Sequence, residues 1–229
     1  HLSRRLWRNR LESRALQDLE REILHIPRDE NEVPGWMIPE IYFDYQRTGD
    51  PSPLAGVLYH NRMDILSLAA LMIYISDALK QVNLEQYSLN ITDIYSLGII
   101  YDDAGLTQRA EKLFLRCLDD KTLDAAFKPD IFTRLAQTYK KQLRWSDAVK
   151  MWSAGAELNS IDAAIELAKY YEHQVRDFKA ASYWTKQARD MVDYSPMLRY
   201  QKKRLLEEIS ARERRLDRLS HKGEEAKRD

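Results

Sequence analysis

The chain has 229 residues, of which 44% are hydrophobic, so it is long enough for one large domain or two small ones with a buried core. Its 36 basic and 36 acidic residues give a formal net charge of zero, so the overall charge selects neither nucleic acid nor a membrane surface as a partner. The 7 glycines and 7 prolines are few for a sheet protein, and 31% of the residues are charged. The composition therefore predicts an all-α chain.

Cysteine content and hydropathy indicate the compartment. The single cysteine, Cys117, excludes an internal disulfide and fits a reducing environment, so we expect a cytoplasmic protein. The longest apolar run, residues 65–75, is about half of what a helix needs to cross a bilayer, so we expect a buried helix there and no membrane association. Because the chain begins with His1 and has no secretory leader, we expect it to be part of a longer protein.

The first ten residues read as the end of a helix with a local excess of positive charge. This cluster could contact the phosphates of a nucleic acid; a solvated helix face or the contact surface for a preceding segment fits the same pattern. The candidate nucleic-acid-binding residues are Arg4, Arg5, Arg8 and Arg10.

Caps and prolines divide the next part of the chain into three predicted helices. Serine favours the N-cap position and proline the first turn, whereas glycine and proline together end a helix. The three helices are expected over residues 14–24 after Ser13, over residues 39–48 from Pro39, and over residues 53–82 after Ser52.

A set of small and large residues recurs three times in the second half of the chain, about 38 and then 32 residues apart. The first copy is Leu97, Gly98, Tyr101, Gly105, Ala110 and Phe114; the second is Leu135, Ala136, Tyr139, Ala148 and Trp152; the third is Leu167, Ala168, Tyr171, Ala180 and Trp184. These intervals bracket the roughly 34-residue period of the tetratricopeptide repeat, in which helix pairs stack because each buries its apolar face only against a neighbour. We predict three such repeats, whose aromatic positions pack between helices and do not stack on bases.

The repeats set the remaining domain boundaries. We expect a join over residues 83–89, the three repeats over residues 90–194 as an α-α superhelix that binds a protein or peptide, and a polar capping helix over residues 195–219. The charged tail, residues 220–229, has almost no apolar residues and is expected to fray.

His60 and Asp64 form the one pair that suggests chemistry. Four residues apart on a helix, they project from the same face. A carboxylate can hold a divalent cation, and an imidazole beside that cation can orient or deprotonate a water molecule. A plain hydrogen bond between the two side chains fits the same spacing.

Four segments of the first 80 residues resemble the C-terminal part of the YprB-type ribonuclease-H-like domain, which is related to the DEDD exonucleases. They are residues 15–20, 33–39, 42–45 and 60–68. The resemblance implies that residues 1–82 are the helical C-terminal part of an α/β domain. It also implies that His60 and Asp64 belong to the last catalytic motif, with Asp64 as a metal ligand and Mg²⁺ or Mn²⁺ as the cofactor.

The same resemblance places the other three acidic residues of the family before His1, so this chain alone is expected to be catalytically silent. The predicted function is therefore a fragment of a metal-dependent 3′–5′ exonuclease that acts on single-stranded nucleic acid and carries a tetratricopeptide-like interaction scaffold. A non-enzymatic adaptor of the tetratricopeptide type is the alternative.

Overall fold

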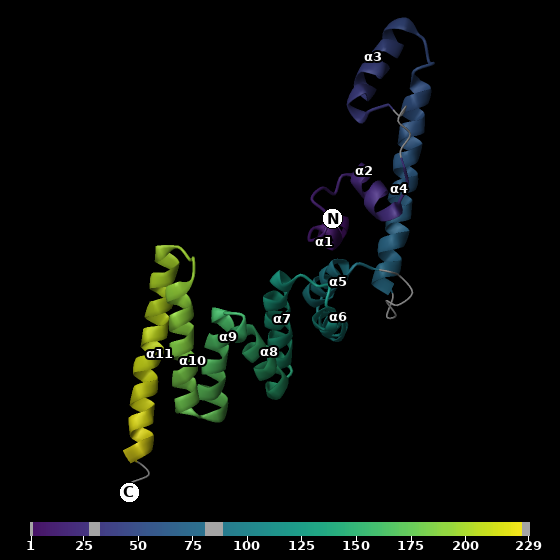
Figure 1. Ribbon diagram of the computed structural model, residues 1–229. Helices are drawn as coiled ribbons and strands as arrows, with labels where there is room; N and C mark the ends of the chain where they lie inside the picture. The colour runs from purple at the N-terminus through teal and green to yellow at the C-terminus, as the bar shows by residue number, and fades with distance from the viewer. Residues whose placement is uncertain (1, 28–32, 81–88, 226–229) are drawn as a thin grey trace. The chain divides into compact units, whose positions relative to one another are not determined.

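A computed structural model describes residues 2–27, 33–80 and 89–225, and within these ranges every regular element is a helix (Figure 1). The prediction of an all-α chain is confirmed for this part of the protein. The chain divides into two compact units, His1–Leu106 and Thr107–Asp229. No helix in the described ranges combines the length and the apolar character needed to cross a membrane.

The N-terminal unit contains five α-helices, one π-helical turn and one 3₁₀ turn within the residues that the structure describes. They are α1 (Leu2–Trp7), α2 (Leu16–Leu19), the π-helical turn η1 (Glu20–Leu24), the 3₁₀ turn η2 (Gly35–Met37), α3 (Ile38–Thr48), α4 (Leu54–Lys80) and α5 (Ile91–Asp103). The helix expected over residues 14–24 begins at Leu16, because the Ser13 hydroxyl accepts a hydrogen bond from the backbone N–H of Ala15 instead of capping the helix (3.3 Å). Pro39 lies in the first turn of α3, and Gly49, with φ of 72°, ends that helix.

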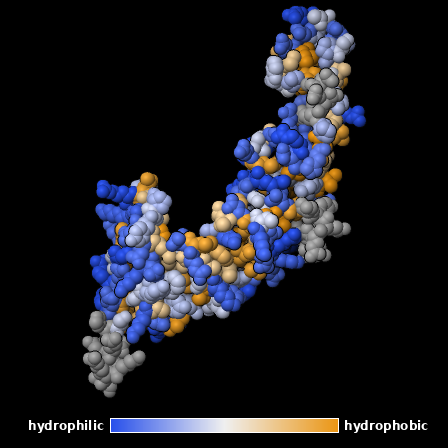
Figure 2. Space-filling model, in the orientation of Figure 1, coloured by the Kyte–Doolittle hydropathy of each residue, from blue (hydrophilic) through white to orange (hydrophobic). Residues whose placement is uncertain are grey.

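Helix α4 buries one stripe and exposes the rest of its apolar surface. The buried stripe consists of His60, Ser67, Leu71 and Ala78. Helix α4 also contacts α2 and η1, where Leu19 and Ile23 are buried. The expectation of a fully buried helix over residues 65–75 is therefore wrong for this chain, since Ile65, Leu66, Leu68, Met72 and Ile73 are all more than half exposed. Figure 2 shows hydrophobic side chains at the surface along α3 and α4.

Helix α5 belongs to the N-terminal unit although it carries the first copy of the repeat. Polar contacts hold it against α1 and the turn that follows α1: Arg5 pairs with Asp103 (2.6 Å), Arg10 pairs with Asp93 (2.9 Å), and the Asn9 amide donates a hydrogen bond to the Ser96 hydroxyl (3.1 Å). The Tyr101 hydroxyl donates a hydrogen bond to the carbonyl of Leu79 in α4. The predicted join before α5 lies outside the described residues, except for Leu89.

The C-terminal unit is a succession of helices, each packed against the next along the chain (Figure 1). They are α6 (Thr107–Asp119), η3 (Ala125–Phe127), α7 (Lys128–Lys141), α8 (Trp145–Glu157), α9 (Ile161–Tyr170), the π-helical turn η4 (Tyr171–Val175), α10 (Phe178–Tyr194) and α11 (Arg199–Glu225). Packing between sequence neighbours is typical of stacked helical repeats.

The second copy of the repeat pattern is buried throughout. Leu135 and Ala136 of α7, Tyr139 at its end, and Ala148 and Trp152 of α8 are all at most 4% exposed. The small side chains allow the two helices to approach closely, and Trp152 fills the remaining space.

The third copy departs from the pattern after its first helix. Ala180 and Trp184 are only partly buried, and the buried stripe of α10 is Ala181, Thr185, Ala188 and Val192. The reason is one additional residue in the turn. In the second copy the Arg144 N–H bonds to the Tyr139 carbonyl, five residues back, whereas in the third copy the Asp177 N–H bonds to the Tyr171 carbonyl, six residues back. The additional residue is accommodated by η4, whose last residue is followed by Arg176 with φ of 60°.

Helix α11 begins later and ends later than expected. Ser195 closes α10, where its hydroxyl donates a hydrogen bond to the Val192 carbonyl (2.9 Å), so α11 starts at Arg199. The helix continues to Glu225, through most of the segment that was expected to fray. Ile209 of α11 joins a buried apolar cluster with Ala188 and Val192, as a helix that covers the end of a stack must do.

Candidate functional site

His60 and Asp64 lie one turn apart on α4, with 3.5 Å between His60 Nε2 and Asp64 Oδ2. The side chain of His60 is 11% exposed and that of Asp64 is 32% exposed. Gly35, the first residue of η2, lies beside the imidazole, because a Cβ added to it would be 3.8 Å from Nε2. The structure therefore brings the predicted pair together and covers the histidine with a neighbouring turn.

A second glycine, Gly56, allows the turn that carries Gly35 to lie over His60. A Cβ on Gly56 of α4 would lie 2.5 Å from Cγ2 of Val33, which is closer than Cβ atoms approach other side chains in proteins. Gly56 is the third residue of α4, and the close approach of Val33 leaves no room for a side chain there. Gly56 lets residues 33–35 lie against α4, one turn before His60.

The pair supplies too few ligands for a complete metal site. Among the described residues, no group of three His, Cys, Asp or Glu side chains could hold a metal ion. Ions such as Mg²⁺ take six ligands and use one or two carboxylates together with waters and substrate phosphates. His60 and Asp64 supply one carboxylate toward such a site, the remaining ligands would have to come from elsewhere, and Asp64 as a metal ligand stays a prediction.

The four candidate arginines are in two different situations. Arg5 and Arg10 pair with the carboxylates of Asp103 and Asp93 on α5, so their charges are matched within the protein. Arg4 and Arg8 are exposed to solvent. Arg10 is partly buried and holds α5 in place, whereas Arg4 and Arg8 are available for a phosphate contact.

Arg10 and Asp93 belong to a buried cluster between three helices. Trp7 and Tyr74 lie beside them, with their ring centroids 6.0 Å apart. Burial raises the pKa of Asp93 to about 6, against the opposing effect of Arg10. Burial and the carboxylate of Asp93 also raise the pKa of Tyr74. The sequence gives no signal for this cluster, since its residues come from positions far apart in the chain.

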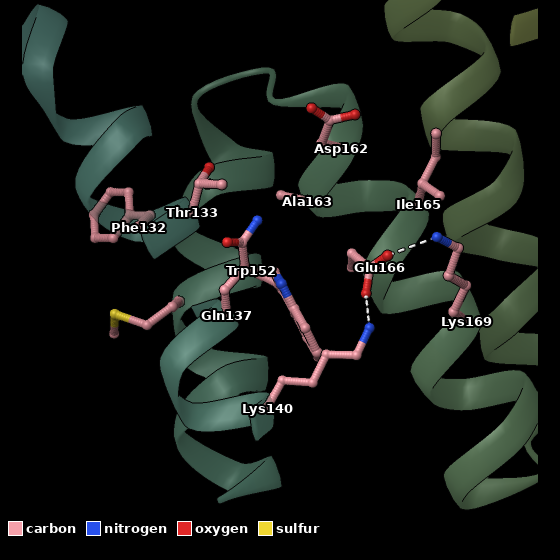
Figure 3. Close-up of a pocket in the computed structure, with 12 residues that line it drawn as sticks. Phe132, Thr133, Gln137, Lys140, Trp152, Asp162, Ala163, Ile165, Glu166 and Lys169 are labelled. Carbon is pink, nitrogen blue, oxygen red and sulfur yellow. Dashed lines mark hydrogen bonds and ion pairs between the residues drawn. The ribbon is translucent and has the colours of Figure 1, made fainter. Parts of the chain in front are cut away.

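The C-terminal unit contains a pocket of ≈ 260 Å³ between α7, α8 and α9 (Figure 3). Two lysines from different helices meet one carboxylate in it. Lys140 lies 2.5 Å from Glu166 Oε2, and Lys169 lies 2.6 Å from Glu166 Oε1. Burial by itself raises the pKa of Glu166, but the two lysines outweigh that effect and hold the pKa below its usual value.

The rest of the pocket is apolar on one side and acidic at its far end. Trp152 forms part of the wall, with the Lys140 ammonium 5.9 Å from its ring centroid. Asp162 lies at the opposite end from the lysines (Figure 3). The spacing of Glu166 and Lys169 is visible in the sequence, but it is an ordinary pair on one helix surface, and nothing in the sequence indicates that Lys140 joins it.

Comparison with known proteins identifies the N-terminal unit in part. Residues 1–76 match the family model of the RNase H superfamily. The match covers α1 to α3 and most of α4, and it contains both His60 and Asp64. The match confirms the prediction of an RNase H-like region over these residues. The assignment of the DEDD motif and the tetratricopeptide repeats stay predictions.

The chain is also similar to "Uncharacterized protein YprB" of Bacillus subtilis (strain 168), with 32% identity over 188 residues. The aligned part is 79% of this chain and 43% of that relative, so the chain spans less than half of the relative's length. No solved structure shows a significant match to the chain.

Proposed function

We propose that this chain is the helical part of a metal-dependent RNase H-like nuclease that degrades single-stranded nucleic acid from its 3′ end. The observation that carries the proposal is the His60–Asp64 pair, half-enclosed beneath Gly35, inside the segment that matches the RNase H superfamily. Asp64 contributes one carboxylate to a site whose other acidic ligands come from a different segment of the full-length protein. His60 holds the orientation of Asp64 and exchanges protons at Nε2.

The incomplete ligand set predicts that the 229-residue chain is inactive by itself. Phosphodiester hydrolysis with two metal ions needs several carboxylates around the ions, and α4 offers one beside His60. The activity therefore belongs to the full-length protein.

The test is degradation of end-labelled single-stranded DNA and RNA by the full-length protein with Mg²⁺ or Mn²⁺. We expect Asp64→Asn to lower the rate by at least about 100-fold, because losing a ligand costs at least as much as losing one of the groups that support it. Asp77→Asn, on the same helix, is the matched control and should keep the wild-type rate. Wild-type activity in Asp64→Asn would remove Asp64 from the mechanism.

We propose as a second candidate that the C-terminal unit binds a peptide through the pocket of Figure 3. The supporting observation is the local excess of one positive charge at the end of the pocket opposite Asp162, where Lys140 and Lys169 share Glu166 beside the apolar surface of Trp152. An acidic side chain next to an apolar one would neutralise that charge and fill the pocket. This candidate stands without any nuclease activity.

Fluorescein-labelled peptides that carry a Glu-Leu or Asp-Leu step test the second candidate by anisotropy. We expect Lys169→Glu to weaken binding about tenfold, since it reverses one of two charges that contact the ligand. Lys150→Glu, on the exposed side of α8, should leave the affinity unchanged. Equal affinities of wild type and Lys169→Glu would exclude the pocket.

A further inference from the structure

The turn between α10 and α11 exposes two aromatic rings. Tyr194, the last residue of α10, is 91% exposed, and Tyr200, in the first turn of α11, is 69% exposed. Neither ring takes part in the buried apolar packing of the C-terminal unit, to which α11 contributes the buried Ile209 and Leu216 and the partly buried Leu205 and Leu206. Exposed rings of this size are available to an outside partner.

Positive charge surrounds the two rings. Between positions 193 and 204 the sequence has four cations, Arg199, Lys202, Lys203 and Arg204, and one carboxylate, that of Asp193. Lys202 turns back to donate a hydrogen bond to the Asp193 carbonyl (2.9 Å). Arg204 makes a long contact of 3.4 Å with Glu208, and both side chains are more than 60% exposed, so this pair holds the arginine only weakly.

The spacing of one tyrosine and two of the cations along α11 places them on one face of the helix. Tyr200, Lys203 and Arg204 are three and four residues apart, so their side chains are neighbours on the surface of α11. All three are exposed, whereas Leu205, Leu206 and Ile209 pack inward against the cluster that α11 shares with α10. In Figure 2 the end of the α10–α11 hairpin carries strongly hydrophilic side chains next to hydrophobic ones.

We propose that this corner, defined by Tyr194, Arg199, Tyr200, Lys203 and Arg204, binds single-stranded nucleic acid. Rings that accept an unpaired base on their face, set among cations that track the phosphates, are the combination that such ligands require. A duplex does not offer free base faces, and the vesicle measurement below separates a single strand from an anionic membrane, whose interface also accepts tyrosine rings and cations. The inference rests on the proposed nuclease function for its choice of ligand, and it assigns substrate binding to a part of the chain outside the RNase H match.

The test is anisotropy of fluorescein-labelled 20-mers of thymidine and of uridine with the 229-residue chain in EDTA, where no metal-dependent cleavage occurs. We expect Tyr200→Ala and Tyr194→Ala each to weaken binding at least about fivefold, because a base loses its stacking partner. Tyr183→Ala, an exposed tyrosine elsewhere on α10, is the aromatic control and should bind as wild type does.

Salt dependence tests the charges independently. For a single strand, the slope of log affinity against log salt concentration steepens by about 0.7 for each phosphate that the protein neutralises. The double variant Lys203→Gln, Arg204→Gln should therefore reduce the magnitude of this slope by about 1.4. Arg214→Gln with Arg218→Gln, further along α11, is the charge-matched control and should keep the slope. All these residues lie at least partly at the surface, and circular dichroism melting curves should coincide with that of the wild type.

Failure of this inference differs from failure of the proposed nuclease. No oligonucleotide binding by the wild-type chain, or equal affinity of the tyrosine variants and the wild type, would overturn the corner as a binding site. A second result would also overturn the proposal: the wild-type chain binds anionic vesicles but no oligonucleotide, and the Lys203→Gln, Arg204→Gln variant loses the vesicle binding. The corner would then bind a membrane surface. The nuclease test measures cleavage by the full-length protein with metal ions and Asp64→Asn, so it stands whichever binding result is obtained here.

Discussion

Asp93 is a carboxylate that is almost completely buried in the N-terminal unit. It is 1% exposed, and burial raises its pKa from 3.8 to about 6 despite the guanidinium of Arg10 at 2.9 Å. Asp93 is therefore harder to ionise in the folded protein than in the unfolded chain. The stability that protonated Asp93 gives the folded state is fully present below about pH 4 and is lost as the pH rises from about 4 to 6.

We predict that Asp93→Asn removes this decline. The free energy of unfolding of the wild type, relative to that of Asp93→Asn, should fall by about 2 kcal/mol between pH 4 and pH 6, since each pKa unit corresponds to about 1.4 kcal/mol and the two titrations extend beyond both ends of that range. Urea unfolding at half-unit pH steps measures the difference. Asp103→Asn, which removes an exposed partner of Arg5, is the control. Its curve of unfolding free energy against pH should run parallel to that of the wild type. Parallel curves for Asp93→Asn would show that the pKa of Asp93 is not raised.

Residue-level prediction from sequence succeeds where the partners are close in the chain. The four-residue spacing of His60 and Asp64 is enough to predict their contact, because helix geometry alone brings them together. The contact of Arg10 with Asp93 is not predictable in this way, since it depends on how α5 packs against the end of α1. The prediction of Arg10 as a nucleic-acid contact takes no account of that carboxylate.

At the scale of elements, the contact of η2 with α4 depends on the absence of one methyl group. Gly56→Ala would place a Cβ 2.5 Å from Val33, and overpacking of this kind costs about 1–3 kcal/mol. Because Gly56 lies in the first turn of α4, the gain in helix propensity offsets only part of that cost. The turn that carries Gly35 would move away from His60.

We therefore predict that Gly56→Ala lowers the free energy of unfolding by about 1 kcal/mol and changes the NMR shifts of the His60 ring. Val33→Ala in the same chain removes the atom that clashes, so the double variant should be more stable than Gly56→Ala and regain the His60 shifts. A double variant that is as unstable as the sum of the two single changes would rule out a direct contact between residues 33 and 56.

Element boundaries are predictable where proline or glycine determines them. Pro39 and Gly49 delimit α3 as expected, because proline suits a first helical turn and glycine adopts the left-handed conformation that ends a helix. The π-helical turns η1 and η4 are not predictable. They are followed by His25 and Arg176 in the left-handed conformation, which is uncommon for residues other than glycine.

At the scale of the whole molecule, composition correctly predicts a helical chain, but sequence periodicity does not give the division into units. The repeat pattern assigns α5 to the second half, whereas ion pairs and hydrogen bonds to α1 and to α4 assign it to the first unit. These contacts join residues that no local pattern connects. The apolar surface of α4 extends around the helix, which is typical of a helix enclosed on all sides.

The additional residue in η4 changes what an alignment of the repeats means. One inserted residue shifts the sequence register by one position, which corresponds to about 100° around a helix axis. From Arg176 onward, residues that align in the sequence pattern therefore no longer occupy the same structural positions. The structural position of the buried Ala148 is occupied by Ala181 and not by Ala180. A substitution transferred by analogy from one repeat to the next would then reach the surface instead of the core.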